Sequence, residues 1–305
     1  MKYRKLGNTN VDVSLLSCGT GGASQFGQRT GLDDAGRAVL VARALELGIN
    51  LFDTAEAYGD AEAMLGKALR GHSRDSYLIA TKWTYRLPGG LADDPHIAIR
   101  SLEQSLRRLE TDYVDIFQIH GILSEHYDQI AEIFIPIMQR LKEAGKTRFL
   151  GVTEMLIKDS KHEATSIAME RHPYVWDSVM LKYGIMNQWA AKRAFPLAYT
   201  SSTGVLNMAP VRLTLTRQEK LKERMNEWGE REGQNALDWL SGGDQKELIG
   251  RGYQFAAEPK AVTTVISGTS NIKHLEANVA SLNCTLSKED LSRLKNTYGK
   301  SASPD

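Results

Sequence analysis

The chain reads INLFDTAEAY over Ile49–Tyr58, and this stretch sets a pattern that later segments repeat. An apolar run of strand length ends on the carboxylate Asp53, and the phenol Tyr58 follows five residues later. Two further apolar runs end in the same way, one at the amine Lys82 and one at the imidazole His120. The ends of successive strands meet at one mouth of a parallel barrel, so we expect these four side chains to lie together.

Strand-like and helix-like runs alternate along most of the chain, in about eight β-α units. This alternation predicts a (β/α)8 TIM barrel. The alternative is a doubly wound open sheet. It is disfavoured because the turn after the first strand, CGTGGASQFG, lacks a GxGxxG fingerprint that leads straight into a helix. The predicted strands are Val13–Ser17, Ile49–Asp53, Tyr77–Thr81, Tyr113–Ile119, Phe149–Val152, Ser178–Tyr183, Gly204–Met208 and Val262–Ile266.

The N-terminus carries its own short motif. Tyr3–Leu6 and Val11–Val13 flank the turn sequence GNTN, which predicts a β-hairpin that plugs the bottom of the barrel. We find no linker-like or low-complexity tract and therefore expect one domain over residues 1–305. The glycine-rich stretch Leu240–Tyr253 interrupts the pattern and is predicted to be a loop or short helix.

Composition narrows the class of protein. Hydrophobic residues make up 42% and charged residues 25%, and the net charge of +1 gives no bulk field to attract nucleic acid or anionic lipid. The start, MKYRKLGNTNVDVSLLS, lacks the apolar core of a signal peptide, and no apolar run is long enough to span a membrane. Cys18 and Cys284 form no CxxC pair, so they suggest neither a disulfide framework nor a zinc site. We therefore expect a cytoplasmic enzyme or binding protein.

The residue types at the strand ends suit proton transfer. Asp53 and Lys82 are expected to pair, because a charge at the edge of an apolar interior needs a partner. The field of Lys82 is expected to lower the pKa of Tyr58 from about 10 toward neutrality, so that the phenol can protonate a carbonyl oxygen. His120 can donate a hydrogen bond to the same oxygen. The alternative is a structural ion pair beside an ordinary aromatic residue. It is disfavoured because four such residues occur in three consecutive units.

A second candidate site follows the last predicted strand. Ser267–Asn271 reads SGTSN and leads into a helix-like run. Small hydroxyl residues and a glycine at the start of a helix suit a phosphate group, and TIM barrels often bind phosphate at this place. The alternative is a capped helix without a ligand.

Three motifs, FDTAEAYG, ATKW and FQIHG, together resemble the aldo-keto reductase superfamily. The resemblance extends to KLGNTNVDVSLLSCGT near the start and VTTVISGTSNIKHLEANVA near the end, so it spans nearly the whole chain. It implies a TIM barrel, NADP(H) or NAD(H) without flavin or metal, and reversible reduction of an aldehyde, ketone or sugar. It also implies that Tyr58 is the general acid and base, that Lys82, held by Asp53, tunes the phenol, and that His120 orients the substrate.

The resemblance also implies a set of cofactor contacts. These are Gly19, Thr20, Thr153, Glu154, Met208, Pro210, Val211, Arg212, Ser267, Gly268, Thr269, Ser270, His274 and Asn278. Arg212 is equally well interpreted as a surface residue. Three positions depart from the family pattern: Glu154 replaces an asparagine, Met180 a glutamine and Met208 an aromatic residue. An arginine that many NADP-dependent members place near Ser270 is absent, so the choice between NADP and NAD stays open.

Aromatic residues are placed to form the substrate wall. Phe26, Trp83 and Tyr85 follow the first and third predicted strands, and Trp83 directly follows Lys82. An apolar wall at the mouth is one interpretation, and packing beneath a loop is the other.

Three functions are compatible with these observations. The first is an NAD(P)-dependent oxidoreductase that acts on a small carbonyl or sugar substrate and has no nucleic-acid or membrane partner. The second is a cofactor-binding regulatory or redox-sensing subunit with little turnover, which the altered residues Glu154, Met180 and Met208 would permit. The third, hydrolysis on a TIM barrel, requires a metal or nucleophile that the sequence does not offer.

Overall fold

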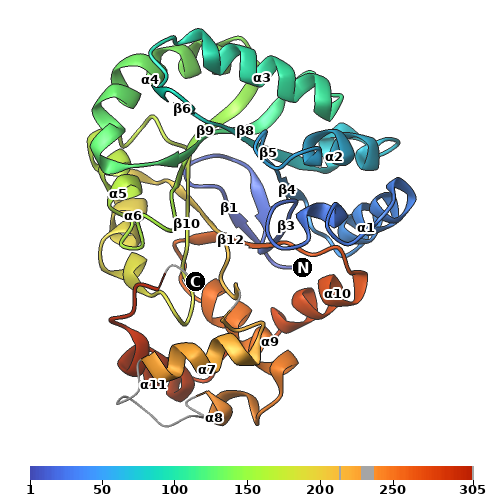
Figure 1. Ribbon diagram of the computed structural model, residues 1–305, viewed down its shortest axis with the longest axis vertical. Coiled ribbons are helices and arrows are strands. Elements are labelled where there is room, and N and C mark those ends of the chain that lie inside the picture. Colours follow the sequence, from blue (N-terminus) through green and yellow to red (C-terminus); the bar gives the residue numbers. More distant parts are fainter. Residues whose placement is uncertain (213, 228–236, 304–305) are drawn as a thin grey trace.

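The protein is described by a computed structural model over residues 1–212, 214–227 and 237–303, and in these ranges eight parallel strands close into a barrel (Figure 1). The strand order around the barrel is β10–β11–β12–β3–β4–β5–β8–β9. This closed order confirms the predicted (β/α)8 fold and excludes the open sheet. The barrel strands are β3 (Leu16–Gly19), β4 (Leu51–Asp53), β5 (Leu78–Trp83), β8 (Val114–Ile122), β9 (Thr147–Glu154), β10 (Ser178–Leu181), β11 (Gly204–Asn207) and β12 (Val262–Ser267).

Helices surround the barrel. Figure 1 shows α1 to α6 and α10 around the strands, with α7, α8, α9 and α11 gathered on one side. The helices are α1 (Asp34–Glu46), α2 (Ala61–Leu69), α3 (His96–Leu109), α4 (Tyr127–Glu143), α5 (Glu163–Arg171), α6 (Ala194–Ser201), α7 (Gln218–Glu227), α8 (Asp238–Ser241), α9 (Gln245–Ala257), α10 (Ile272–Ser281) and α11 (Lys288–Tyr298). Among the described residues, no helix is long and apolar enough to cross a bilayer.

The ends of α1 follow from local sequence. The side chain of Asp33 accepts a hydrogen bond from the Gly36 backbone N–H at 2.7 Å and so caps the first turn. Gly48, with φ of 83°, ends the helix in a conformation that side chains with a Cβ rarely adopt.

The stretch Leu240–Tyr253, predicted to be a loop or short helix, contains the end of the short helix α8, a turn and the first nine residues of the 13-residue helix α9. Asp244 caps this helix by accepting a hydrogen bond from the Lys246 backbone N–H. Gly252 serves packing, because a Cβ atom there would lie 2.5 Å from a methyl carbon of Val211. A small residue in the helix therefore permits a close approach of the preceding loop.

The barrel interior is filled by side chains that alternate along the strands. Leu78 and Ala80 of β5, Ile116 of β8 and Leu206 of β11 belong to one buried cluster. Leu6 and Val13, from the hairpin of β1 (Tyr3–Lys5) and β2 (Asp12–Ser14), pack against the same cluster and are fully buried. The predicted hairpin therefore closes the bottom of the barrel.

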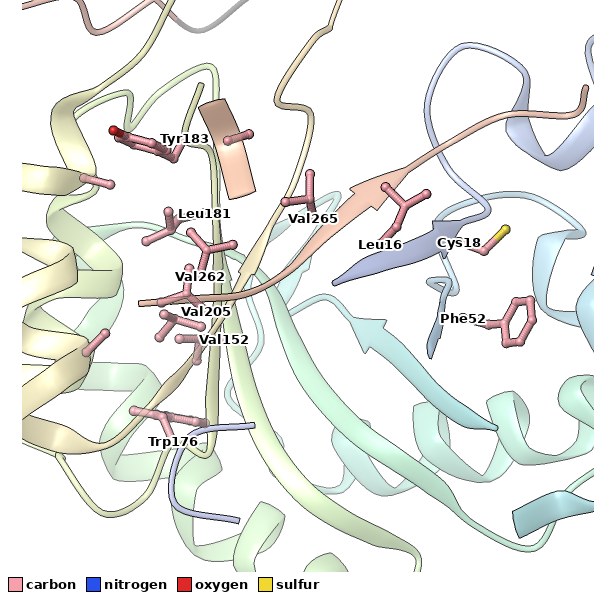
Figure 2. Packing of buried hydrophobic residues seen from close by; sticks show 14 of the residues in the cluster. Leu16, Cys18, Phe52, Val152, Trp176, Leu181, Tyr183, Val205, Val262 and Val265 are labelled. Carbon is pink, nitrogen blue, oxygen red and sulfur yellow. The ribbon is translucent and has the colours of Figure 1, made fainter. Parts of the chain in front are cut away.

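The intervening residues of each strand face the helices. Phe52, Ile79, Phe117 and Val205 belong to a second, larger cluster, and Figure 2 shows several of its members. Neighbouring residues on a strand thus point to opposite sides of the barrel wall. This alternation decides which residues at the strand ends can reach the mouth.

Candidate active site

Lys82 and Asp53 form a buried ion pair at the mouth of the barrel. Lys82 Nζ donates to Asp53 Oδ1 at 2.7 Å and to the Thr54 carbonyl oxygen at 2.6 Å. Lys82 is fully buried, and Asp53 is only 4% exposed. The two residues lie on adjacent strands, β5 and β4, on the side that faces the interior. The predicted pairing is thus present.

Tyr58 and His120 complete the group. Lys82 Nζ lies 5.0 Å from the centroid of the Tyr58 ring. The ring of His120 meets that of Tyr58 edge to face, with centroids 5.7 Å apart and an interplanar angle of 82°. The structure therefore brings together all four residues that the sequence singled out.

The electrostatics of Tyr58 differ from the sequence-based prediction. Burial raises the pKa of Tyr58 above its ordinary value, and the charge of Lys82, which acts in the opposite direction, does not cancel this effect. Burial alone would lower the pKa of Lys82, but the charges of Asp53 and Tyr58 raise it. Tyr58 is therefore protonated at neutral pH and Lys82 is an ammonium ion, which is a suitable state for an acid and the cation that stabilises its conjugate base.

His120 is electrically neutral over the physiological range. Burial, followed by the charges of Lys82 and Arg86, lowers the pKa of His120 to about 3. A neutral imidazole has one N–H donor and one acceptor. His120 can therefore donate a hydrogen bond to a substrate oxygen without a charge of its own.

Two residues that sequence reasoning missed hold Tyr58 in place. A Cβ atom at Gly21 would lie 2.8, 2.9 and 3.2 Å from three carbons of the Tyr58 ring, so only glycine leaves room for it. The side-chain amide of Gln28 donates to the Tyr58 carbonyl oxygen at 3.0 Å and accepts from the Asp60 backbone N–H at 3.2 Å. The segment after β3 therefore positions the phenol from two sides.

The loop after β12 lies beside this segment. A Cβ atom at Gly268 would lie 3.1 Å from the Gly21 carbonyl oxygen and 3.6 Å from that of Gly19. The Ser270 hydroxyl is 3.0 Å from the Thr30 hydroxyl. Asn271 caps α10 by accepting hydrogen bonds from the backbone N–H groups of the next turn. Glycines that allow close approach, with hydroxyl groups at a helix N-terminus, match what a phosphate group requires.

Comparison with known proteins decides the family. The sequence model of the Aldo/keto reductase family matches residues 18–298. The chain belongs to the aldo/keto reductase family. Members of this family are oxidoreductases that act on carbonyl and sugar substrates.

Individual relatives cover nearly the whole chain. L-galactose dehydrogenase of Arabidopsis thaliana is 30% identical over 92% of this chain and 88% of its own length. L-glyceraldehyde 3-phosphate reductase of Escherichia coli (strain K12) is 26% identical over 96% of this chain and 91% of its own. The solved holo form of the aldo-keto reductase AKR11C1 from Bacillus halodurans superimposes with a TM-score of 0.74 at 27% identity, and covers 97% of this chain and 96% of that one.

Several predicted cofactor contacts lie at the mouth of this aldo/keto reductase. Thr20 follows β3, and its buried hydroxyl has no hydrogen-bond partner among the described residues. Met208 is half-buried and packs against the interior cluster. Arg212 is exposed, and its charge acts on Tyr58. Thr153 faces the interior, where its hydroxyl accepts a hydrogen bond from the Gly121 backbone N–H at 2.8 Å.

Other predicted contacts serve packing. The Ser267 hydroxyl accepts hydrogen bonds from the Tyr253 hydroxyl at 3.1 Å and from Asn278 Nδ2 at 2.9 Å, which ties β12 to α9 and α10. Val211 is buried against Gly252 of α9. Three further predicted cofactor contacts differ in their surroundings. Pro210 is buried with its carbonyl group against Gly184, Thr269 is buried, and His274 is exposed on α10.

Glu154 is placed differently from the prediction. It faces away from the barrel interior, where Oε2 lies 2.6 Å from His162 Nδ1 and Oε1 accepts a hydrogen bond from the Lys182 backbone N–H at 2.9 Å. His162 Nε2 lies 3.3 Å from Asn187 Oδ1. Asn187 Nδ2 in turn donates to the Ser303 carbonyl oxygen at 3.2 Å. Glu154 therefore holds α5 and the C-terminal segment to the outer face of the barrel.

The predicted aromatic wall is also corrected. Trp83 points outward and packs against Phe117 and Phe134, with ring centroids 6.4 and 4.9 Å away. Phe26 is fully buried, and Tyr85 is 1% exposed with its hydroxyl 2.9 Å from His126 Nδ1. All three belong to the outer hydrophobic cluster, which favours the alternative of packing beneath loops.

Proposed function

We propose that this chain is an NAD(P)H-dependent reductase that interconverts a small aldehyde, ketone or sugar carbonyl and the corresponding alcohol, with residues 1–305 acting as one domain. The observation that carries the proposal is a buried ammonium ion, Lys82, held between Asp53 and a protonated phenol, Tyr58. The relatives named as an L-galactose dehydrogenase and an L-glyceraldehyde 3-phosphate reductase support the reaction class.

The residues at the mouth fit a nicotinamide cofactor. Its phosphate groups would lie where the backbone at Gly268 comes close to that of Gly19 and Gly21, held by the hydroxyl groups of Thr269 and Ser270. Arg212 would neutralise their charge. Met208 would pack on the nicotinamide ring through its polarizable sulfur. When bound, the reduced cofactor supplies a hydride to the carbonyl carbon.

Tyr58 supplies the proton in this proposal. Its hydroxyl gives a proton to the carbonyl oxygen as the C–O double bond becomes a single bond, and the tyrosinate that remains is stabilised by Lys82. His120 is neutral and donates a hydrogen bond to the same oxygen, which fixes the orientation of the substrate. Water returns a proton to Tyr58 after the alcohol leaves.

The test is a titration of the protein's fluorescence with NADPH and with NADH, followed by a panel of aldehydes, ketones and sugars with the cofactor that binds more tightly. We expect saturable binding and turnover of at least one carbonyl compound. Absence of binding would overturn the proposal. Tight binding without turnover across the panel would instead favour a cofactor-binding regulatory subunit.

A further inference from the structure

Arg86 places a further cation at the mouth, in addition to Lys82 and Arg212, on the side away from the predicted cofactor loop. It lies in β6 (Arg86–Leu87), which follows β5 and pairs with β7 (Gly90–Leu91). Its guanidinium donates a hydrogen bond to the carbonyl oxygen of Gly121, the residue that follows His120 in the sequence. A Cβ atom at Gly121 would lie 3.0 Å from Arg86 Nη2 and 3.3 Å from Nη1. The guanidinium therefore lies over the irregular end of β8 (Val114–Ile122), which carries the imidazole of the site.

The position of Arg86 separates it from Arg212. Arg212 follows β11, and β11 and β5 are four steps apart in the eight-stranded order, through β12, β3 and β4. The parent strands are thus on opposite walls of the barrel. A cofactor whose phosphate groups lie along Arg212 and the β12 loop would leave Arg86 to the substrate.

The guanidinium of Arg86 has fewer partners among the described residues than the guanidinium groups of Arg74 and Arg4. Other half-buried arginines of the barrel are compensated: Arg74 pairs with Asp115 at 2.7 Å, and Arg4 donates to three carbonyl oxygens. Among the residues that the structure describes, Arg86 has no carboxylate partner. Its guanidinium contacts the Gly121 carbonyl oxygen and the side chain of Tyr85, to which it donates a hydrogen bond and whose ring centroid is 5.4 Å from its Cζ.

The nearby acid does not change this. Glu125, in the short 3-10 helix Ser124–His126, is exposed, and its carboxylate accepts a hydrogen bond from Ser124. A guanidinium has five N–H donors in a planar fork, so the contacts with Gly121 and Tyr85 leave further donors of Arg86 for another acceptor. Partial burial strengthens a charge-assisted hydrogen bond to an incoming anion.

We propose that Arg86 binds an anionic oxygen group, a carboxylate or a phosphate ester, on the carbonyl substrate, so that anionic aldehydes are reduced in preference to their neutral counterparts. This inference rests on the proposed reductase function. Met155, whose Cε would lie 3.5 Å from a Cβ at Gly121, borders the guanidinium and would pack on the carbon chain of such a substrate.

The test compares matched aldehydes with wild-type protein, Arg86→Met and Arg86→Lys. Butanal and succinic semialdehyde differ by a carboxylate, and glyceraldehyde and glyceraldehyde 3-phosphate differ by a phosphate. We expect the wild type to prefer the anionic member of at least one pair by about tenfold or more in kcat/KM, and the pair that shows the preference identifies the group. Arg86→Met should reduce that ratio on the order of 10- to 100-fold, whereas Arg86→Lys keeps the charge without the fork and should fall between.

Arg100→Met is the matched control, because Arg100 is an exposed arginine of α3 paired with Asp94 at 2.9 Å. It should leave both substrate ratios unchanged. A second measurement follows inhibition of butanal reduction by acetate and by inorganic phosphate, whose inhibition constant should rise in Arg86→Met. Equal wild-type rates for both members of each pair, or a ratio within twofold of wild type in Arg86→Met, would overturn the inference while the reductase function stands. A lack of turnover of all four aldehydes with bound cofactor would overturn this inference, and the wider panel of aldehydes, ketones and sugars would then decide the reductase function.

Discussion

Lys82 and Glu154 each lie at the end of a barrel strand and each form a buried acid–base pair, yet the two pairs face opposite sides of the barrel wall. Lys82 and Asp53 face the mouth, beside Tyr58. Glu154 and His162 face the helices, where they hold structural elements together. The difference follows from the alternation of side chains along a strand. A charged residue at a strand end joins the site only if the alternation of side chains along the strand places it on the interior side of the barrel wall.

The largest expected effect is a loss of catalytic activity when the inward pair, Lys82 and Asp53, is broken. Lys82→Met removes the cation that stabilises tyrosinate, so kcat/KM with a carbonyl substrate should fall by roughly 100-fold or more. Steady-state kinetics on folded protein, checked by circular dichroism, measures this loss. Lys67→Met is the control, because Lys67 is an exposed lysine whose ion pair with Asp34 spans 3.3 Å. Retention of wild-type rates in Lys82→Met would contradict the assignment of this pair to the site.

Breaking the outward pair should affect stability and not chemistry. Glu154→Leu leaves His162 buried without its partner and the Lys182 backbone N–H without its acceptor, so the free energy of unfolding should fall by about 3–5 kcal/mol. Urea denaturation measures this change, and Glu154→Gln, which keeps an acceptor oxygen, should lose less. Loss of turnover in Glu154→Leu protein that is fully folded would instead return Glu154 to the cofactor site.

The packing around Tyr58 allows a test of whether catalysis depends on the position of the phenol ring. Gly21→Ala inserts a methyl group against the Tyr58 ring, so the phenol must shift, and kcat should fall by roughly 100-fold. Gly89→Ala is the matched control, because a Cβ atom there meets nothing within 4 Å. Steady-state kinetics of the two variants provides the comparison. An unchanged kcat in Gly21→Ala would show that Tyr58 needs no support from this segment.

The smallest expected effect is a pH dependence of stability from His120. Its pKa is about 3 in the folded protein and about 6.5 when unfolded, so the unfolded chain binds more protons between these values. The His120 contribution to stability is therefore complete above pH 6.5 and declines as the pH falls toward 3. Urea unfolding at pH 7 and pH 4.5 should show a smaller acid loss in His120→Asn than in the wild type. Equal losses would contradict a neutral buried imidazole.

The barrel and its four mouth residues could be predicted because each lies in a local pattern. Asp53, Lys82 and His120 end apolar runs, and Tyr58 follows the first of these runs within five residues. Trp83 was misplaced because the prediction used its proximity to Lys82, and Glu154 because it was carried over from the family position of an asparagine; neither prediction considered which side of the strand the residue faces. Each directly follows a residue that faces the interior, so each must face outward.

The remaining site residues depend on tertiary contacts. Nothing local in the sequence marks Gly21 as the glycine that contacts the Tyr58 ring, or Gln28 as the residue that holds its backbone. The rise in the Tyr58 pKa likewise depends on how much of the ring the fold removes from water, which the order of residues does not encode.

The most direct test of the central claim is a single-turnover measurement with Tyr58→Phe. Cofactor-loaded wild-type and variant proteins are mixed with an excess of a carbonyl substrate, and oxidation of the reduced cofactor is followed by its absorbance. Phenylalanine keeps the ring and removes the proton, so we predict that the variant binds cofactor with an affinity close to wild type while its rate of oxidation falls by roughly 100- to 10,000-fold. A single-turnover rate equal to that of the wild type would contradict Tyr58 as the proton donor.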